Sequence, residues 1–516
     1  MEQFRHMMKL VDWQNPMVGS GATLLALLCA YYGLQTGAQQ QQQGKRPPRR
    51  MSFSSRTLID GSFPAAATVA EPIINVGMYF EKCPTVAAVT EIAAELSKVS
   101  RFRSSMVRGA SGAYEFEEIP EGLDMNNHVI PVVVANEAEM RDRVTALVKE
   151  DFDGSDGVPL FRFVVLQNKG KGVSCLLFRV HHVVGDGLAL VGAMNRVFKD
   201  KSGASVNINI AENMKGGKVD SDGAGGGFVA SVINALSIGV RAVTALGHVL
   251  SLGLSTSDSQ TAMSKPSSSI KMEKEYRDIV LFPTLRLDFI KAIKKAAGAT
   301  VNDVLLSATG GAITRYCIAR GETGPARVRA LIPVAFPRSR EELDDPVRSM
   351  KNKWAFVSAQ LPTSAPTAMG RLEDASKEMQ IVKLSGRVVV QRWVQEVLLP
   401  HLPQFLARQT AFDIFSRHSM VFSNVPGPQT DIYMGGERMC GMQVLFPNLL
   451  NQTMIISYGG GVFMNMCTDP RLVPDPLVLI DGFTQELREL AGKLDLPCSD
   501  KDMFVQSTTS TLMGMV

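Results

Sequence analysis

Closely spaced cysteines are missing from this sequence. Its seven cysteines lie far apart along 516 residues, and none forms a Cys-x-x-Cys pair or has a histidine at the spacing of a zinc site. Zinc fingers and small disulfide-linked scaffolds need such spacings, so both classes are excluded. Isolated cysteines are typical of reduced core residues, which suits a protein that faces the cytosol. We therefore expect no metal site.

The chain also lacks an excess of charge of either sign. The formal net charge is +4, and charged residues make up 20% of the sequence. This balance gives no reason to expect a nucleic-acid partner, because such partners usually require a strongly basic surface. The length is enough for two or three domains, each with its own core.

Charge is absent from residues 15–44, a long segment near the N-terminus. Within it, residues 17–34 form an apolar block that would extend over about 27 Å as a helix, enough to reach across a hydrocarbon core. A basic run, residues 45–50, follows and puts the rest of the chain in the cytosol. We expect a membrane anchor, with a cleaved signal or a plastid-type targeting segment as alternatives. The expected localisation is a membrane, that of the endoplasmic reticulum, with the folded part facing the cytosol.

A second interruption separates two folded blocks. Glycine pairs and runs punctuate residues 201–275, which we interpret as a linker. Inside it, residues 228–254 are apolar except for Arg241, His248 and small polar residues, so that a helix on a bilayer surface and an ordinary buried helix are both open. The expected units are residues 1–50 (anchor and Gln-rich tether), 51–200 (first domain), 201–275 (linker), 276–500 (second domain) and 501–516 (disordered tail).

Apolar patterns predict helices and strands in both blocks, and the alternation of the two in the first block implies a layered α/β domain. In the first block they predict helices over residues 85–99, 137–149 and 188–198 and strands over 129–134, 160–166 and 174–180. In the second they predict helices over 287–297, 300–319 and 474–493 and strands over 328–335 and 353–361. Pro131 places its strand at a sheet edge, because proline cannot donate a ladder hydrogen bond. Gly310 and Gly311 each cost a helix roughly 1 kcal/mol relative to alanine, so we expect close packing there.

The strongest chemical signal lies in residues 176–190. A predicted strand ends in His181 and His182, and the apolar pattern restarts after Asp186 and Gly187. An imidazole at a strand end can reach into a cleft from a rigid backbone, and its ordinary pKa of about 6.5 lets it take a proton near neutral pH. The alternative is that one or both histidines are structural, held by hydrogen bonds in a core.

The pattern His-His-x-x-x-Asp-Gly resembles the signature of the CoA-dependent acyltransferase superfamily built like chloramphenicol acetyltransferase. Nonribosomal peptide condensation domains carry it too. Further motifs follow in order: Pro159-Leu160-Phe161, residues 299–305 with Asn302-Asp303, residues 423–428 (Ser-Asn-Val-Pro-Gly-Pro), and Asp469 before Pro474-Asp475. Together they resemble the bifunctional wax ester synthase/diacylglycerol acyltransferase family over residues 160–493, whereas condensation domains lack the Asn-Asp and Asn-Val-Pro-Gly-Pro elements. This chain has Phe161 where the family usually has tryptophan.

The resemblance implies two chloramphenicol acetyltransferase-like layered domains with a tunnel at their interface, in addition to the N-terminal hydrophobic helix. It implies an O-acyltransferase that moves a long-chain fatty acyl group from acyl-CoA to a fatty alcohol, to diacylglycerol or to both, at a membrane or lipid-droplet surface. Acyl-CoA is a substrate, and no further cofactor is implied. A noncatalytic acyl-lipid-binding or scaffold protein with the same fold is the alternative.

The resemblance also implies roles for the histidine motif. His182 matches the general base that takes the proton from the attacking alcohol. His181 is either catalytic or a buried hydrogen-bonding residue. Asp186 is implied to be structural, bonded away from the ring to hold the turn. Gly187 is implied to let the backbone bend tightly.

The second block contributes candidate substrate-binding residues. Asn302 is the candidate donor to the tetrahedral oxyanion, with an ordinary residue of a helix start as the alternative. Asp303 beside it stands where a carboxylate favours a helix start. The later motif is implied to line the tunnel through Ser423, Asn424, Pro426 and Gly427.

Overall fold

The computed structural model describes residues 71–108, 114–120, 122–152, 157–206, 208, 244, 247, 256–264, 277–322, 327–336, 338–345, 348–398, 413–448 and 450–505. The anchor expected in residues 1–50 and nearly all of the apolar segment 228–254 lie outside these ranges. Among the helices that are described, none combines the length and apolar character that crossing a bilayer requires.

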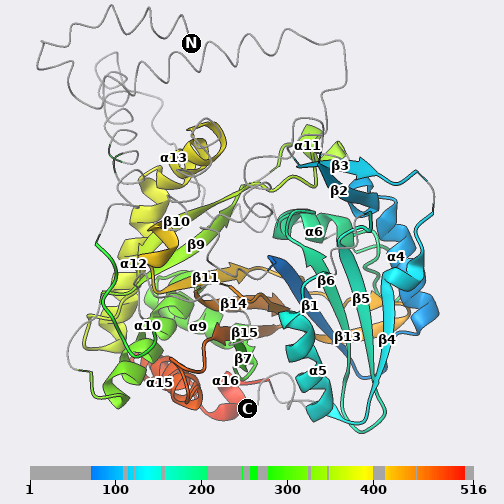
Figure 1. Ribbon diagram of the computed structural model, residues 1–516. Coiled ribbons are helices and arrows are strands. Elements are labelled where there is room, and N and C mark those ends of the chain that lie inside the picture. Colours follow the sequence, from blue (N-terminus) through cyan, green and yellow to red (C-terminus); the bar gives the residue numbers. More distant parts are fainter. Residues whose placement is uncertain are drawn as a thin grey trace, which may run out of the picture.

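The first half of the chain builds a mixed sheet with the strand order β12-β13-β1-β6-β5-β4 (Figure 1). Its strands are β1 (Ile73–Phe80), β4 (Val129–Val134), β5 (Phe161–Asn168), β6 (Ser174–His181), β12 (Tyr433–Met434) and β13 (Glu437–Leu445). The helices of this half are α4 (Val86–Ser97), α5 (Glu137–Lys149) and α6 (Gly187–Met194), and β2 (Ser104–Arg108) pairs with β3 (Tyr114–Glu118) in a small separate sheet. The predicted hairpin of β5 and β6 is confirmed, and β4, which carries Pro131, is an edge strand as expected.

Two strands of the first sheet come from the second half of the chain. β13 pairs antiparallel with β1, so that Val444 lies opposite Val76. The core of the first half also takes in Ile456, Tyr458 and Phe463. The sequence predicts that all of residues 276–500 belong to the second domain, whereas the structure places part of this range in the first sheet. The two halves therefore share strands and core side chains.

The second half forms another mixed sheet, with the order β10-β9-β11-β14-β15-β7 and with β8 paired to β15. Its strands are β7 (Asp278–Leu281), β8 (Leu285–Arg286), β9 (Arg329–Ala335), β10 (Trp354–Gln360), β11 (Met420–Val425), β14 (Asn451–Tyr458) and β15 (Gly461–Thr468). Its helices are α9 (Leu287–Ala297), α10 (Val301–Ala319), α11 (Arg340–Asp344), α12 (Ala368–Leu384), α13 (Arg387–Trp393), α15 (Leu477–Lys493) and α16 (Asp500–Met503). Figure 1 shows α10, α12 and α15 on the flank of this sheet that faces away from the first half. The layered α/β architecture expected from the sequence is confirmed.

Helix α10 is buried along most of its length and supports the second sheet. Thr300 and Asp303 form a capping box at its start, where each side chain accepts a hydrogen bond from the other's backbone N–H. A Cβ at Gly310 would lie 2.9 Å from Pro362, and one at Gly311 would lie 2.4 Å from Glu486. The close packing predicted at these two glycines is confirmed, and it explains why larger residues are excluded.

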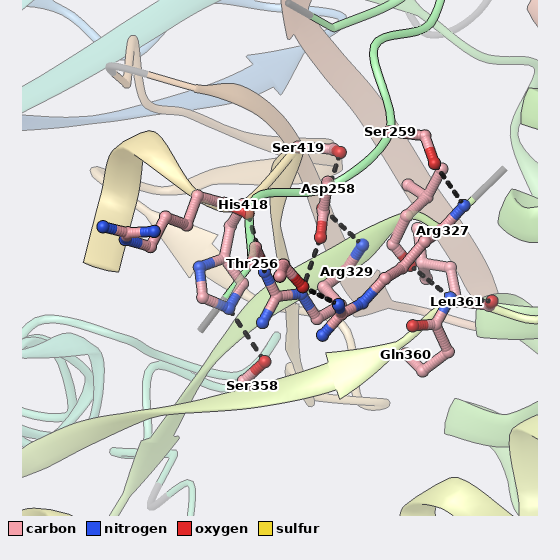
Figure 2. A network of polar contacts seen from close by, with 12 residues as sticks. Thr256, Asp258, Ser259, Arg327, Arg329, Ser358, Gln360, Leu361, His418 and Ser419 are labelled. Carbon is pink, nitrogen blue, oxygen red and sulfur yellow. Dashed lines mark hydrogen bonds and ion pairs between the residues drawn. The ribbon is translucent and has the colours of Figure 1, made fainter. Parts of the chain in front are cut away.

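The end of the predicted linker is fastened to the second sheet by a buried ion pair (Figure 2). Asp258 accepts hydrogen bonds from Arg329 Nε at 2.6 Å and from Ser419 Oγ at 2.7 Å. Arg329 also donates to the backbone oxygens of Thr256 and Arg417. Residues 256–264 are thus part of the folded second half and not a free connection.

The tail expected from residue 501 begins later. Helix α16 buries Met503 completely, and Phe504 forms a β-bridge with Leu285. The backbone N–H of Val505 donates to Thr284 at 2.9 Å. The predicted disorder is therefore wrong for residues 501–505.

Candidate active site

A cavity of about 1470 Å³ is lined by side chains from both halves of the chain. Its wall is mainly apolar, with residues from β1, β9, β11 and β14. The polar side chains in the lining include His182, Asn302 and Asn424. Within the described ranges, no group of three histidine, cysteine, aspartate or glutamate side chains could hold a metal ion. The cavity is therefore suited to a long apolar ligand that meets a few polar groups.

His182 enters this cavity from the end of a strand. Strand β6 ends at His181, so the predicted position of the two histidines at a strand end is confirmed. The backbone N–H of His182 donates to the oxygen of Pro72 at 2.8 Å. The ring centroid lies 5.9 Å from that of Trp354 and 6.0 Å from that of Phe446. These contacts hold the imidazole, which comes from the first half of the chain, between two aromatic side chains of the second half.

Asn352, two residues before β10 begins, orients this imidazole. Its Nδ2 donates to the backbone oxygen of His182 at 2.9 Å, so its Oδ1 is the atom that faces the ring nitrogen Nδ1 at 3.1 Å. Nδ1 must then carry the proton, which leaves Nε2 with the free lone pair. Burial lowers the pKa of His182 below its ordinary value of 6.5, against smaller raising effects of the Asp186 charge and the Asn352 hydrogen bond. At neutral pH the ring is uncharged and can accept a proton.

Asp186 bonds to groups other than the imidazoles. It caps α6 by accepting from the N–H of Ala189 at 2.9 Å, and it accepts from the N–H of Lys353 at 2.7 Å. Both its oxygens also accept from Arg338 Nη2 at 2.9 Å, in an ion pair whose side chains are almost completely buried. Asp186 thus joins the histidine motif to the segment that carries Asn352. This arrangement supports the structural role implied for Asp186.

Asn302 and Asn424, which both line the cavity, are hydrogen-bonded to each other. Asn424 lies in β11, and its Nδ2 donates to Asn302 Oδ1 at 2.5 Å. This bond turns the Asn302 amide so that its own Nδ2 hydrogens are left to donate elsewhere. Gly427 follows β11, and a Cβ there would lie 2.1 Å from the backbone oxygen of Ser457. Only glycine permits this close approach of the two backbones, and Ser423, Asn424, Pro426 and Gly427 all line the cavity as expected.

The chain matches two family models. The wax ester synthase/diacylglycerol acyltransferase catalytic domain matches residues 74–305, and the C-terminal domain of the same family matches residues 350–491. The chain belongs to the wax ester synthase/diacylglycerol acyltransferase family. It is therefore an acyltransferase, and the histidine motif and the Asn302 motif both fall within the matched catalytic domain.

Individual proteins are similar to this chain in sequence or in fold. A Mycobacterium tuberculosis protein named a diacylglycerol O-acyltransferase is 24% identical over 362 residues, 66% of this chain and 68% of that protein. The solved wax ester synthase/diacylglycerol acyltransferase from Marinobacter aquaeolei VT8 superposes with a TM-score of 0.52 at 17% identity, over 82% of this chain and 95% of that one. The starter condensation domain of rhizomide synthetase gives 0.55 at 13% identity, over 88% and 97%. At these identities the two solved structures establish the fold.

His181 and Gly187, two members of the histidine motif, differ from the roles considered for them above. His181 is 3% exposed, its Nδ1 accepts from the N–H of Val183 at 3.2 Å, and burial lowers its pKa to about 3. The tight bend expected at Gly187 is wrong, because its φ is not positive and a Cβ there would meet nothing within 4 Å. The close approach is at Gly185, where a Cβ would lie 2.9 Å from Ala189. Gly187 begins α6 on the cavity wall instead.

Two further residues lie away from the cavity. Asp303 is buried in the capping box of α10, and its Oδ2 also accepts from Ser376 at 3.2 Å. Its predicted place in substrate binding is therefore wrong, and its place at a helix start is confirmed. Phe161 is completely buried and packs against Phe102 and His128, so this aromatic residue belongs to the core.

Two partners that hold the motif in place, Asn352 and Arg338, are not among the site residues predicted from the sequence. Asn352 lies 170 residues from His182 and Arg338 lies 152 residues from Asp186. A polar residue directly before a predicted strand was the only local signal for Asn352. No local signal in the sequence connects Arg338 with a buried carboxylate.

Proposed function

We propose that this family member transfers a long-chain fatty acyl group from acyl-CoA to the hydroxyl of a fatty alcohol, of diacylglycerol or of both. The observation that carries the proposal is the neutral imidazole of His182 in a cavity lined by both halves, with Nδ1 held by Asn352. A base in this position needs no cofactor to act on a hydroxyl. The cavity would serve as the tunnel in which donor and acceptor meet.

In the proposed reaction, His182 Nε2 takes the proton of the acceptor hydroxyl while its oxygen attacks the thioester carbonyl carbon. The Asn302 amide, turned by Asn424, is the candidate donor to the oxyanion of the tetrahedral intermediate. The C–S bond then breaks, the ester leaves, and the proton on His182 passes to the CoA thiolate. Such a base contributes about 10²- to 10⁴-fold to a rate, and one oxyanion donor about 10²- to 10³-fold.

The test is release of free CoA thiol by purified protein that is given a long-chain acyl-CoA and a fatty alcohol. We expect His182→Ala to lower kcat by about 10²-fold or more, while the midpoint of thermal unfolding changes little. A normal kcat in His182→Ala would show that His182 is not the general base. The competing reading, a noncatalytic acyl-lipid-binding or scaffold protein, predicts tight binding of acyl-CoA without thiol release for any acceptor.

The identity of the acceptor is decided by competition. Fatty alcohol and diacylglycerol at equal concentration, with one labelled acyl-CoA, should give labelled wax ester and triacylglycerol in the ratio of the two kcat/KM values. A single labelled product would restrict the proposal to one acceptor.

We also propose that the protein works at a membrane or lipid-droplet surface, on the cytosolic side of the endoplasmic reticulum. The support is the apolar block of residues 17–34 and the basic run of residues 45–50 after it. Deletion of residues 1–50 should move the protein from a carbonate-resistant membrane pellet to the supernatant. An unchanged pellet would assign the attachment to another segment, with residues 228–254 as the first candidate.

A further inference from the structure

The charged side chains of the cavity fall into two groups. Three of them interact with other parts of the chain: Glu71, Asp186 and Arg277. The remaining three are all lysines, Lys291, Lys294 and Lys383, and none forms an ion pair with any described residue. These three lysines therefore have no counter-ion among the described residues, in a cavity whose wall is mainly apolar.

Two of the lysines stand together at one edge of the second sheet. Lys291 and Lys294 are three residues apart on α9, so they lie on one face of the helix, and both are exposed. Helix α9 follows β8, which pairs with β15. This position places two adjacent cations at the β15 side of the cavity.

The opposite edge of the same sheet is apolar. Helix α13 packs against β10, four strands from β15, which corresponds to about 19 Å at the usual strand spacing. Leu384 and Val388 line the cavity there, and Leu384 is 62% exposed. Lys383 is thus a single cation beside an apolar rim, whereas the two α9 lysines form a basic rim.

We propose that Lys291 and Lys294 bind the phosphate groups of the CoA moiety, so that the donor enters the cavity from the β15 edge. This rests on the proposed function. A CoA thioester is polyanionic at its nucleotide end and apolar at its acyl end, which matches a cavity with one basic rim and an apolar interior. Lysine ammonium groups bind phosphate through charge-assisted hydrogen bonds.

The test compares donors with and without phosphates. The full-length protein, Lys291→Gln/Lys294→Gln and the matched control Lys295→Gln are assayed with a long-chain acyl-CoA and with the corresponding acyl-pantetheine, which carries no phosphate. Lys295 lies on the same helix, is exposed and does not line the cavity. In the double variant we expect the ratio of KM for acyl-CoA to KM for acyl-pantetheine to rise about tenfold or more, with kcat for acyl-CoA within about twofold of normal. The ratio in Lys295→Gln should equal that of the unchanged protein.

Two results would overturn the inference while the acyltransferase activity stands: an unchanged KM ratio, or an equal rise in KM for both donors. If no donor is turned over at all, the proposed function fails, and the phosphate site is tested by calorimetry alone. The unchanged protein should then bind CoA more tightly than pantetheine, and the double variant should lose this preference. Equal affinity of the unchanged protein for CoA and pantetheine would reject the site.

Discussion

Two histidines, the half-buried His182 after strand β6 of the first sheet and the buried His418 before strand β11 of the second, have similar polar partners but different access to the cavity. His182 is hydrogen-bonded to Asn352, and His418 is hydrogen-bonded to Ser358, whose Oγ lies 2.8 Å from its Nε2 (Figure 2). Burial lowers the pKa of both rings, that of His418 to about 4. Both imidazoles are therefore neutral at pH 7.

A buried aspartate–arginine pair lies near each histidine. Asp186 and Arg338 join the histidine motif to the segment before β10, and Asp258 and Arg329 join the linker end to β9. In both pairs the side chains are at least nine-tenths buried. The two regions thus use the same kinds of residue to bring distant segments together.

The two imidazoles differ in whether a ring nitrogen is free to accept a proton. The contact of His418 Nδ1 is the backbone oxygen of Ile414, so Nδ1 donates and Nε2 accepts from Ser358. Both nitrogens are occupied, the ring is completely buried, and neither His418 nor Ser358 lines the cavity. A serine and a histidine at hydrogen-bond distance resemble a nucleophile and its base. Without access for a substrate, the same geometry only stabilises the fold.

The largest expected effect comes from breaking the two ion pairs, because each substitution leaves a buried guanidinium without its partner. Asp186→Asn and Asp258→Asn should each lower the free energy of unfolding by about 3–5 kcal/mol, measured by denaturant titration. Activity per folded molecule should fall only in Asp186→Asn, because Asp186 holds the segment next to Asn352. An equal loss of kcat in Asp258→Asn would show that the two regions are not functionally distinct.

The next effect concerns pH. A histidine with a lowered pKa in the folded state binds fewer protons than in the unfolded chain, so stability is lost as pH falls below about 6.5 and the loss levels off near the folded pKa. For His418 this corresponds to roughly 3 kcal/mol between pH 6.5 and pH 4. His418→Gln should flatten the pH dependence of the unfolding free energy over this range. The fall of kcat at acidic pH, which depends on the protonation of His182, should lie below pH 6.5 and should be the same in His418→Gln. A shift of this acid limb of the kcat–pH profile in His418→Gln would contradict the comparison.

Local signals in the sequence were sufficient to predict individual elements. Helices α5 and α9 have the predicted bounds, because Asn136 caps the start of α5 and Gly298, in the left-handed region, ends α9. Helix α6 was predicted to reach Phe198 but ends at Met194. Val197 and Phe198 are buried beyond its end, so the apolar pattern correctly indicated burial there and wrongly indicated helix.

Pairings between distant segments could not be predicted in the same way. The contact of Asn352 with His182 and the pairing of β13 with β1 join residues far apart in the chain. Hydrophobic periodicity reports which face of an element is buried, but it does not identify the partner across the core. The sequence motif was sufficient to identify His182 as the candidate base. The orientation of its ring depends on Asn352, whose contact with His182 is formed only when the two halves are folded together.

The smallest expected effect tests the orientation of the base by matched deletions. Asn352→Ala removes the acceptor of His182 Nδ1–H, and Ser358→Ala removes the corresponding hydrogen bond of His418. Asn352→Ala should lower kcat about tenfold, with KM for acyl-CoA nearly unchanged, because the ring keeps its place but loses its fixed tautomer.

The pH profile separates orientation from a general loss of structure. The Asn352 hydrogen bond raises the pKa of His182, so its removal should move the acid limb of kcat to lower pH. Ser358→Ala should change neither kcat nor this limb. If Asn352→Ala lowers kcat but does not shift the acid limb of the kcat–pH profile, Asn352 acts on the fold and not on the base. If Ser358→Ala lowers kcat to the same extent, the hydrogen bond at His182 has no special role, since an inaccessible histidine would then matter as much as the one in the cavity.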